Sequence, residues 1–204
     1  EEGKELSVAI KAAAVKDYLL STIEFDNGRT KRLRGALNAQ TSFFFNEKKQ
    51  ATAHVKVLPS HIFVSDSTWN IEPCDIVYSK DNLIVDHFAV EHNKQHIIVS
   101  GLASRNKSDK LILDLKEVDV GYLLNLLNFH AVSFGGEATG VASISSIFHH
   151  PEMEAQLSVD KFKFQEGNLG LLRAKAVYDS NEGKINIDAV AEQDGDRKTL
   201  INGF

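Results

Sequence analysis

The stretch "EMEAQLSVD", Glu152 to Asp160, alternates strictly between apolar and polar residues. Met153, Ala155, Leu157 and Val159 fall on one side of this alternation, and the polar residues fall on the other. Because successive side chains of a strand point to opposite faces of a sheet, a period of two predicts a β-strand with one buried face. The rest of the chain can be compared with this pattern.

The same alternation recurs along the sequence. "KLILDLKE" places Leu111, Leu113 and Leu115 on one face, and "KINIDAVAE" does the same with Ile185 and Ile187. "LIVDHFAVEH" and "QHIIVSG" form two further strand patterns around a polar turn at residues 93–94. The sequence therefore predicts an all-β fold, a sheet of repeated antiparallel hairpins.

One segment departs from this period. In "DVGYLLNLLNF" the apolar residues recur at helical spacing, and Asp119 is available as the N-cap. We expect one short helix from about Asp119 to Asn128. "IKAAAVKDYLL" is ambiguous, because its alanines favour a helix while the residues just before it alternate like a strand.

The chain also resembles itself. Leu83 to Gly101 can be placed over Ile185 to Gly203 at a constant offset, and "IVYS" at Ile76 matches "AVYD" at Ala176 after a short insertion. A looser third copy is "FDNGRTKRLRGALNA". We expect an N-terminal β segment at 1–65 and a repeat region at 66–204, with copies near 76–101 and 176–203.

Composition limits the function classes. Hydrophobic residues make up 43% and charged residues 25%, which is typical of a folded chain, and the net charge of -5 argues against nonspecific nucleic-acid binding. The single cysteine, Cys74, excludes an intrachain disulfide. No apolar stretch approaches the roughly 20 residues of a membrane-spanning helix. Both ends fall within strand-like pattern, so we expect a fragment of a longer protein, and any export signal or membrane anchor would lie outside it.

Phe134 to Val190 carries an ordered series of landmarks: glycines, a proline, an alternating strand, an N-L-G turn and a hairpin that ends in a Y-D turn. The landmark residues are Gly136, Gly140, Pro151, Leu157, Phe162, Phe164, Asn168, Leu169, Gly170, Tyr178 and Asp179. This order resembles the repeated module of the TamB translocation and assembly family, within the AsmA-like group. The resemblance covers roughly Phe63 to Phe204.

The resemblance implies a fold, a place and an activity. TamB-like proteins are long periplasmic proteins anchored in the inner membrane, and their strands form an elongated, curved sheet called a β-taco. They are implicated in outer-membrane biogenesis, through phospholipid transport and through protein assembly or secretion with an Omp85-type outer-membrane partner. The implied ligands are phospholipid acyl chains or strands of outer-membrane proteins. None of the landmarks is catalytic, so we expect neither an enzyme nor a cofactor.

The apolar interior of such a sheet would be lined by the alternating residues. We expect the hydrophobic groove to be formed by Leu83, Val85, Leu111, Leu113, Leu115, Leu157, Val159, Phe162, Phe164, Ile185 and Ile187. Periodicity alone leaves open whether this face is an open groove or a filled core.

Two groups of histidines raise the alternative of a metal site. The first is "IFHHPEME", with His149, His150, Glu152 and Glu154, and the second contains His87, His92 and His96. A metal needs three or four converging ligands, whereas adjacent residues of a strand point apart. At the first group we expect Ile147 and Phe148 to close a strand and Pro151 to turn the chain, with solvated side chains and with its two histidines pointing apart. At the second group we expect surface positions and a Glu91–His96 pair.

The sequence gives little support for a cysteine nucleophile or a phosphate-binding loop. Cys74 has no histidine near it in sequence, and "GGEATG" lacks the lysine that a phosphate-binding loop needs. The alternative function is a β-sandwich that binds carbohydrate or protein, with Trp69 as a stacking platform. A lone tryptophan is more often a core residue, so we expect Trp69 to be buried.

Overall fold

The structure is a computed structural model that describes residues 7–26, 33–64, 66–122, 133–180, 183–193 and 197–203. Within these ranges the protein is nearly all β, with one large antiparallel sheet of fifteen strands and one short helix. This confirms the predicted fold class. The strands are β1 (Ser7–Val15), β2 (Tyr18–Asp26), β3 (Leu33–Phe45), β4 (Ala51–Val57), β5 (Ser60–Val64), β6 (Ser67–Ile71), β7 (Cys74–Ser79), β8 (Asn82–His92), β9 (Gln95–Ala103), β10 (Lys110–Asp119), β11 (Phe134–Ser145), β12 (Glu152–Phe164), β13 (Gly167–Asp179), β14 (Lys184–Gln193) and β15 (Arg197–Gly203).

The chain divides into two compact units. Unit 1 is Glu1–Asn93 with Ile98–Leu102, and unit 2 is Lys94–Ile97 with Ala103–Phe204. The boundary predicted at residue 65 falls inside unit 1, where β5 and β6 pair directly and Phe63 lies opposite Thr68.

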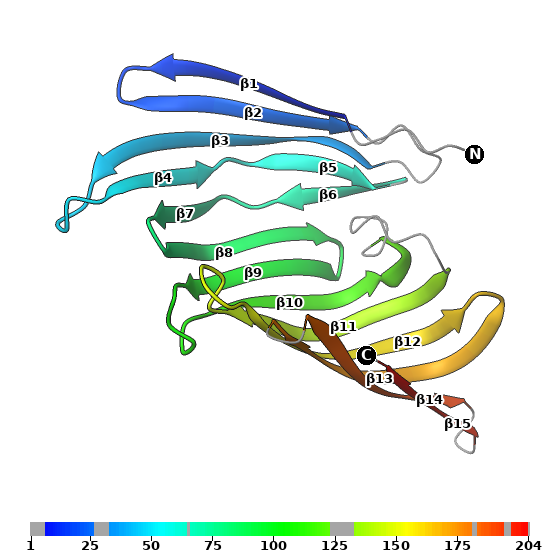
Figure 1. Ribbon diagram of the computed structural model, residues 1–204. Coiled ribbons are helices and arrows are strands. Elements are labelled where there is room, and N and C mark those ends of the chain that lie inside the picture. The colour runs from blue at the N-terminus through cyan, green and yellow to red at the C-terminus, as the bar shows by residue number, and fades with distance from the viewer. Residues whose placement is uncertain are drawn as a thin grey trace. The chain divides into compact units, whose positions relative to one another are not determined.

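In unit 1 the strands run in the order β1-β2-β3-β4-β7-β8, and β5 and β6 form a hairpin between β3 and β8 (Figure 1). Prolines explain two interruptions in the strands, between β4 and β5 and between β6 and β7. Pro59 separates β4 from β5, and Pro73 separates β6 from β7. Proline has no backbone N–H to give to the ladder, so each ribbon is interrupted at this residue. At the first break the Ser60 hydroxyl accepts the backbone N–H of Asn38 at 2.9 Å.

Unit 1 has its own buried core beneath one face of these strands. Val57, Trp69 and Ile71 are 2%, 3% and 5% exposed. The expectation that Trp69 is a core residue is confirmed, and its ring packs against that of His92 with centroids 5.6 Å apart. Trp69 therefore offers no exposed platform for a sugar ring.

Strands β10 to β15 of unit 2 follow one another, each pairing with the next (Figure 1). Val159 lies opposite Ala138 on one side and Leu172 on the other, and Leu172 lies opposite Ala191. These four residues are buried, with Phe162 and Ala189, in one core cluster. The strand predicted from "EMEAQLSVD" is confirmed, but its apolar side is buried only at Val159, half-buried at Ala155 and Leu157, and exposed at Met153.

Two strands of unit 2 contain bulges that the sequence reading missed. The register shifts between Leu115 and Val118 in β10, and between Val159 and Phe162 in β12. Each interval holds a residue with a left-handed backbone, Glu117 (φ 51°) and Lys161 (φ 52°). A bulge adds a residue to one strand only, so that apolar residues three apart face the same way.

The predicted N-cap of the short helix is confirmed. The helix begins at Val120, and the backbone N–H of Tyr122 donates to Asp119 Oδ1 at 3.1 Å, so Asp119 is the N-cap. The rest of the predicted helix lies outside the described residues, as do residues 27–32 of the third repeat copy. The ambiguous "IKAAAVKDYLL" belongs to β1 and β2, which pair from Val15–Tyr18 outward.

The end of β11 differs from the prediction that Ile147 and Phe148 close a strand. The strand ends at Ser145, and Ile147 and Phe148 lie in the turn that follows. The cause is Ser146, whose left-handed backbone (φ 52°) turns the chain and whose carbonyl accepts the N–H of His149 at 3.0 Å.

The two predicted repeat copies share part of their register. Tyr78 lies opposite Leu83 in the first, and Tyr178 lies opposite Ile185 in the second. The similarity stops at His87, whose backbone is left-handed (φ 59°), whereas β13 and β14 pair without a shift.

Candidate functional site: the apolar sheet faces

One face of unit 2 is apolar along successive rows of directly opposed residues. Opposed residues of antiparallel strands point to the same face, so each row can be read from the register. The rows, in order along the strands, are Ala138, Val159, Leu172 and Ala191; Gly140, Leu157, Ala174 and Ala189; Ala142, Ala155, Ala176 and Ile187; Ile144, Met153, Tyr178 and Ile185. None of these residues is charged.

Exposure rises along these rows. Val159 and Leu172, in the first row, are 5% and 8% exposed, whereas Met153 and Ile185, in the last row, are 45% and 51% exposed. Ile187 in the third row is 41% exposed. The face is therefore covered at one end of the strands and open at the other. We call Met153, Ile185 and Ile187 the open end of unit 2.

The predicted lining residues of unit 2 lie on this face. Leu111, Leu113 and Leu115 lie opposite Ile144, Ala142 and Gly140, which places β10 on it as well. Their burial separates the predicted residues into two groups. Leu115, Val159 and Phe162 are buried core, whereas Ile185 and Ile187 are exposed.

Phe164 belongs to the exposed group but has aromatic neighbours. It is 43% exposed, and its ring centroid lies 5.5 Å from that of Phe134. Phe134 also stacks on the buried Phe162 at 6.1 Å. The three rings therefore connect the buried core to the surface at this side of β12.

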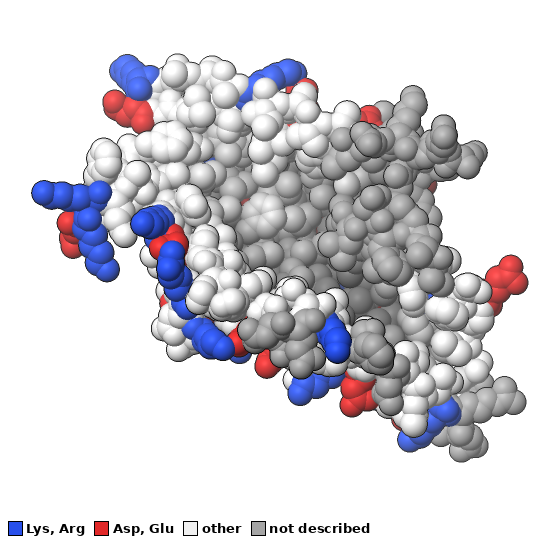
Figure 2. All heavy atoms as spheres, viewed as in Figure 1, with Lys and Arg blue, Asp and Glu red and all other residues white. Residues whose placement is uncertain are grey.

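Unit 1 has an apolar face of the same kind. Val85 lies opposite Ile76 and is buried, and Leu83 lies opposite Tyr78, which is 50% exposed. The next strands continue this row through Ala53 to Phe43. In the view of Figure 2 the described residues of unit 1 are mostly uncharged, with lysines and acidic residues along the margins.

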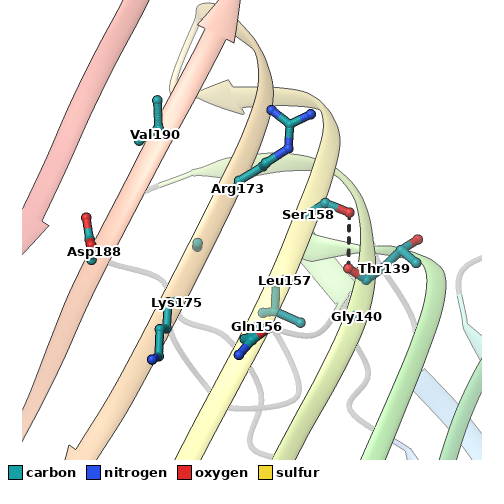
Figure 3. A pocket seen from close by; sticks show the side chains of 10 residues that line it. Thr139, Gly140, Gln156, Leu157, Ser158, Arg173, Lys175, Asp188 and Val190 are labelled. Carbon is teal, nitrogen blue, oxygen red and sulfur yellow. Dashed lines mark hydrogen bonds between the residues drawn. The ribbon is translucent and has the colours of Figure 1, made fainter.

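A shallow hollow of about 600 Å³ lies on the opposite, polar face of unit 2 (Figure 3). It is lined by Thr139, Gly140, Gln156, Leu157, Ser158, Arg173, Ala174, Lys175, Asp188 and Val190. Arg173 pairs with Glu192 at 2.9 Å, and Lys198 pairs with the same carboxylate at 3.1 Å. The hydrogen bonds from Lys198 and then Arg173 lower the pKa of Glu192. The hollow mixes both signs of charge and is open to solvent, so it does not favour an acyl chain.

The histidine groups do not form a metal centre in the described part of the chain, where no three His, Cys, Asp or Glu side chains converge. The expectation that His149 and His150 point apart is wrong. Their ring centroids lie 4.1 Å apart, because the turn after Ser146 is not a strand and does not alternate its side chains. Glu152 and Glu154 point away from Met153, as predicted, and Glu152 pairs with Lys107.

The second histidine group is dispersed. His92 Nδ1 lies 2.7 Å from the carbonyl oxygen of Thr68, and His96 Nε2 lies 3.2 Å from Asp114 Oδ1. His87 occupies the left-handed position of β8. His92 and His96 therefore each have a local partner. The predicted Glu91–His96 pair stays a prediction.

The thiol of Cys74 is buried and holds its proton at neutral pH. Cys74 is 6% exposed and lies opposite the buried Val57. Burial, and then the carboxylates of Asp75 and Asp86, raise the pKa of the thiol to about 11. A thiol with this pKa is almost wholly protonated at neutral pH, so Cys74 is not a nucleophile there.

Two glycines of β11 lie where an added side chain would meet the backbone of β12. At Gly140 a Cβ would overlap the carbonyl oxygen of Gln156 and lie 2.9 Å from Leu157 Cα. At Gly136 a Cβ would lie 2.6 Å from the carbonyl oxygen of Asp160. The backbones of β11 and β12 therefore approach too closely for any side chain at these two positions. Sequence reading identified the glycines as landmarks but not this packing.

None of the described helical residues belongs to a helix long and apolar enough to cross a bilayer. Comparison of the chain with protein-family models, curated proteins and solved structures found no match.

Proposed function

We propose that the protein binds the acyl chains of lipids along its apolar sheet faces and acts in lipid transfer. The observation that carries this proposal is the open end of unit 2. Met153, Ile185 and Ile187 are exposed in rows whose described residues carry no charge, and these rows are continuous with the buried row of Val159 and Leu172.

Physical chemistry favours an acyl chain as the occupant of this face. Leaving large apolar side chains in water costs roughly 25 cal/mol per Å² of apolar surface. The rows offer no charge or amide that would orient a polar ligand, and their small residues, such as Ala142, Ala155 and Ala176, leave the sheet surface flat. A flexible apolar chain can cover such a strip and slide along it without breaking specific bonds.

The cellular setting is proposed from the resemblance described above. A TamB-like role would place the protein in the periplasm, anchored to the inner membrane by a segment outside this chain, with an Omp85-type partner at the outer membrane. Phospholipid would then move passively along the apolar face, or a strand of an outer-membrane protein would lie on it. Neither process requires catalysis or a cofactor.

The proposal can be tested with a matched pair of variants. Met153 and Val141 are both 45% exposed, but Met153 lies on the apolar face and Val141 lies on the polar face. We expect Met153→Arg to weaken binding of a dansyl-labelled fatty acid by roughly tenfold or more, because the acyl chain would have to desolvate the charge. Val141→Arg should leave the affinity within about twofold.

Two results would contradict the proposal. One is a parent chain that neither binds the labelled fatty acid nor takes up phospholipid from vesicles. The other is an equal loss of affinity in Met153→Arg and Val141→Arg. Circular dichroism of both variants shows whether the sheet is intact, which separates lost binding from lost folding.

A further inference from the structure

Three turns of unit 1 lie at the same end of its strands. They join β1 to β2 at residues 16–17, β3 to β4 at residues 46–50 and β7 to β8 at residues 80–81. The registers place them together, because Leu19 lies opposite Thr41, and Thr52 lies opposite both Phe44 and Ser79. We call this the turn end of unit 1, and its three turns are visible together in Figure 1.

Large aromatic side chains are exposed at the turn end. Phe43, Phe44 and Phe45 close β3 and are 70%, 47% and 76% exposed, and Tyr78 on β7 is 50% exposed. Exposing three consecutive phenylalanine rings to water costs free energy. Covering each ring with an apolar neighbour would recover that free energy. Their number at one tip points to an apolar medium that covers them.

These phenylalanines occupy both faces of the strand. Phe43 and Phe45 point to the apolar face, opposite Ala53 and Ala51, while Phe44 points to the other face, opposite Thr52. A protein partner or a lipid lying on one face would cover Phe43 and Phe45 and leave Phe44 in water. A medium that surrounds the tip of the hairpin covers all three.

Four backbone N–H groups of the β3–β4 turn are hydrogen-bonded within the turn. The Asn46 side chain accepts the N–H groups of Lys48 and Gln50, each at 3.0 Å. The Asn46 carbonyl accepts the N–H of Lys49 at 2.8 Å, and the Asn46 N–H donates to the Gln50 carbonyl at 3.0 Å. Moving backbone groups out of water is expensive only when they lose hydrogen bonds, so these four N–H groups can enter a less polar medium without that cost.

The charges at the turn end fit the surface of a membrane. Lys48 and Lys49 lie in the turn that follows the phenylalanines, after Asn46 and Glu47, and Lys16 and Lys80 lie in the neighbouring turns. Aromatic rings beside lysines are typical of the region between lipid headgroups and acyl chains, where the rings are buried and the lysines reach anionic phosphates. Glu47, Asp17 and Asp81 leave a small positive balance, which favours an anionic surface.

We propose that the turn end of unit 1 inserts into the headgroup region of a bilayer that contains anionic lipid. Phe43, Phe44 and Phe45 enter the acyl boundary, and Lys48 and Lys49 bind lipid phosphates. This docking site is separate from the open end of unit 2 and does not depend on the proposed acyl-chain binding.

The test is flotation of the whole chain with vesicles of phosphatidylcholine, with and without phosphatidylglycerol. We expect the chain to float with the anionic vesicles and Phe43→Ser to lower the bound fraction roughly tenfold. The matched control is Ile10→Ser, because Ile10 is 69% exposed but lies on β1, about 20 Å from the turn. Lys48→Gln with Lys49→Gln should weaken binding to anionic vesicles by roughly tenfold or more, whereas Lys11→Gln with Lys56→Gln should not.

A second measurement asks whether the tip is surrounded. In a Trp69→Phe background, Phe44→Trp supplies the only tryptophan of the chain. Vesicles of bromine-labelled phospholipid should quench this tryptophan, because position 44 would lie among acyl chains.

Several outcomes would overturn the docking proposal. They are a chain that does not bind anionic vesicles, equal loss with Phe43→Ser and Ile10→Ser, no quenching at position 44, or sedimentation showing that the phenylalanines instead mediate self-association. Binding of the labelled fatty acid should be unchanged in Lys48→Gln with Lys49→Gln, because both lysines lie in the turn and not in the apolar rows. This readout keeps failure of the docking site distinct from failure of the acyl-chain proposal.

Discussion

Val159 and Phe162 lie three residues apart in β12, and yet both are buried in the same core cluster. In a regular strand they would point to opposite faces. The bulge between them, with Lys161 in a left-handed conformation at φ 52°, brings Phe162 back to the apolar face. The same segment, "VDKF", has a near copy in "VDHF" of β8, where His87 has φ 59°. The bulges are thus part of how this sheet keeps its apolar residues together.

The first prediction concerns this bulge. Lys161→Gly should stabilise the protein by up to about 1 kcal/mol, because glycine adopts a left-handed backbone without the steric cost of a Cβ. Lys161→Val should destabilise it by roughly 1–2 kcal/mol, since a β-branched residue tolerates this conformation least. Urea unfolding of each variant measures the difference. Lys163→Gly is the control, because Lys163 is exposed on the same strand, and glycine there should destabilise.

The second prediction concerns the approach of β11 to β12. Gly140→Ala should cost roughly 1–3 kcal/mol of unfolding free energy, because the added Cβ would overlap the Gln156 carbonyl. At Gly135 an added Cβ would meet only the Lys163 side chain, at 3.7 Å, so Gly135→Ala should be nearly neutral. Thermal unfolding of the two variants gives the comparison. Equal stabilities would show that the strands do not approach as closely as described.

The third prediction separates filled core from exposed lining among the predicted groove residues. Phe162 is 4% exposed and Phe164 is 43% exposed. Phe162→Ala should lower the unfolding free energy by about 3–5 kcal/mol through the cavity it leaves, whereas Phe164→Ala should lower it by about 1 kcal/mol. Denaturant titration measures both, and a larger loss at Phe164 would contradict the assignment of Phe162 to the core.

The fourth prediction concerns pH. The pKa of Cys74 rises from 9.0 to about 11 on folding, so the folded state holds its proton more tightly than the unfolded state. The resulting stability is present below pH 9 and is lost as the pH rises toward 11. The unfolding free energy of the parent should therefore fall more steeply above pH 9 than that of Cys74→Ala. The thiol should also react with Ellman's reagent slowly at neutral pH and rapidly in urea, and rapid reaction in the folded chain would show that it is accessible.

Local patterns were enough for much of the fold. Period-two alternation identified "EMEAQLSVD" and "KINIDAVAE" as strands, because a strand's two faces differ in polarity whatever their neighbours are. Asp119 marked the start of the helix for the same local reason, since a side-chain acceptor must be available where the first backbone N–H groups are free. The prediction that His149 and His150 point apart was wrong, because it applied the alternation of a strand to residues that lie in the turn begun at Ser146.

The sequence predicted which residues of the candidate site share a face, but not which of them are buried. The sequence placed Leu115, Val159, Ile185 and Ile187 on apolar faces, and the register agrees. It could not tell that the first two are buried and the last two open, because burial depends on what strands distant in sequence cover. The phenylalanines of the turn end were missed because Phe43, Phe44 and Phe45 do not alternate.

The sequence by itself determined that this chain makes strands, where prolines break them and which residues can be apolar neighbours. These follow from short-range stereochemistry and from the two-residue repeat of a strand. Only the tertiary structure decided which end of each apolar face is covered, because this depends on the register of strands and on bulges such as that at Lys161. The open end at Met153 and the aromatic tip at Phe44 exist for that reason, since each is what the packing of the other strands leaves uncovered.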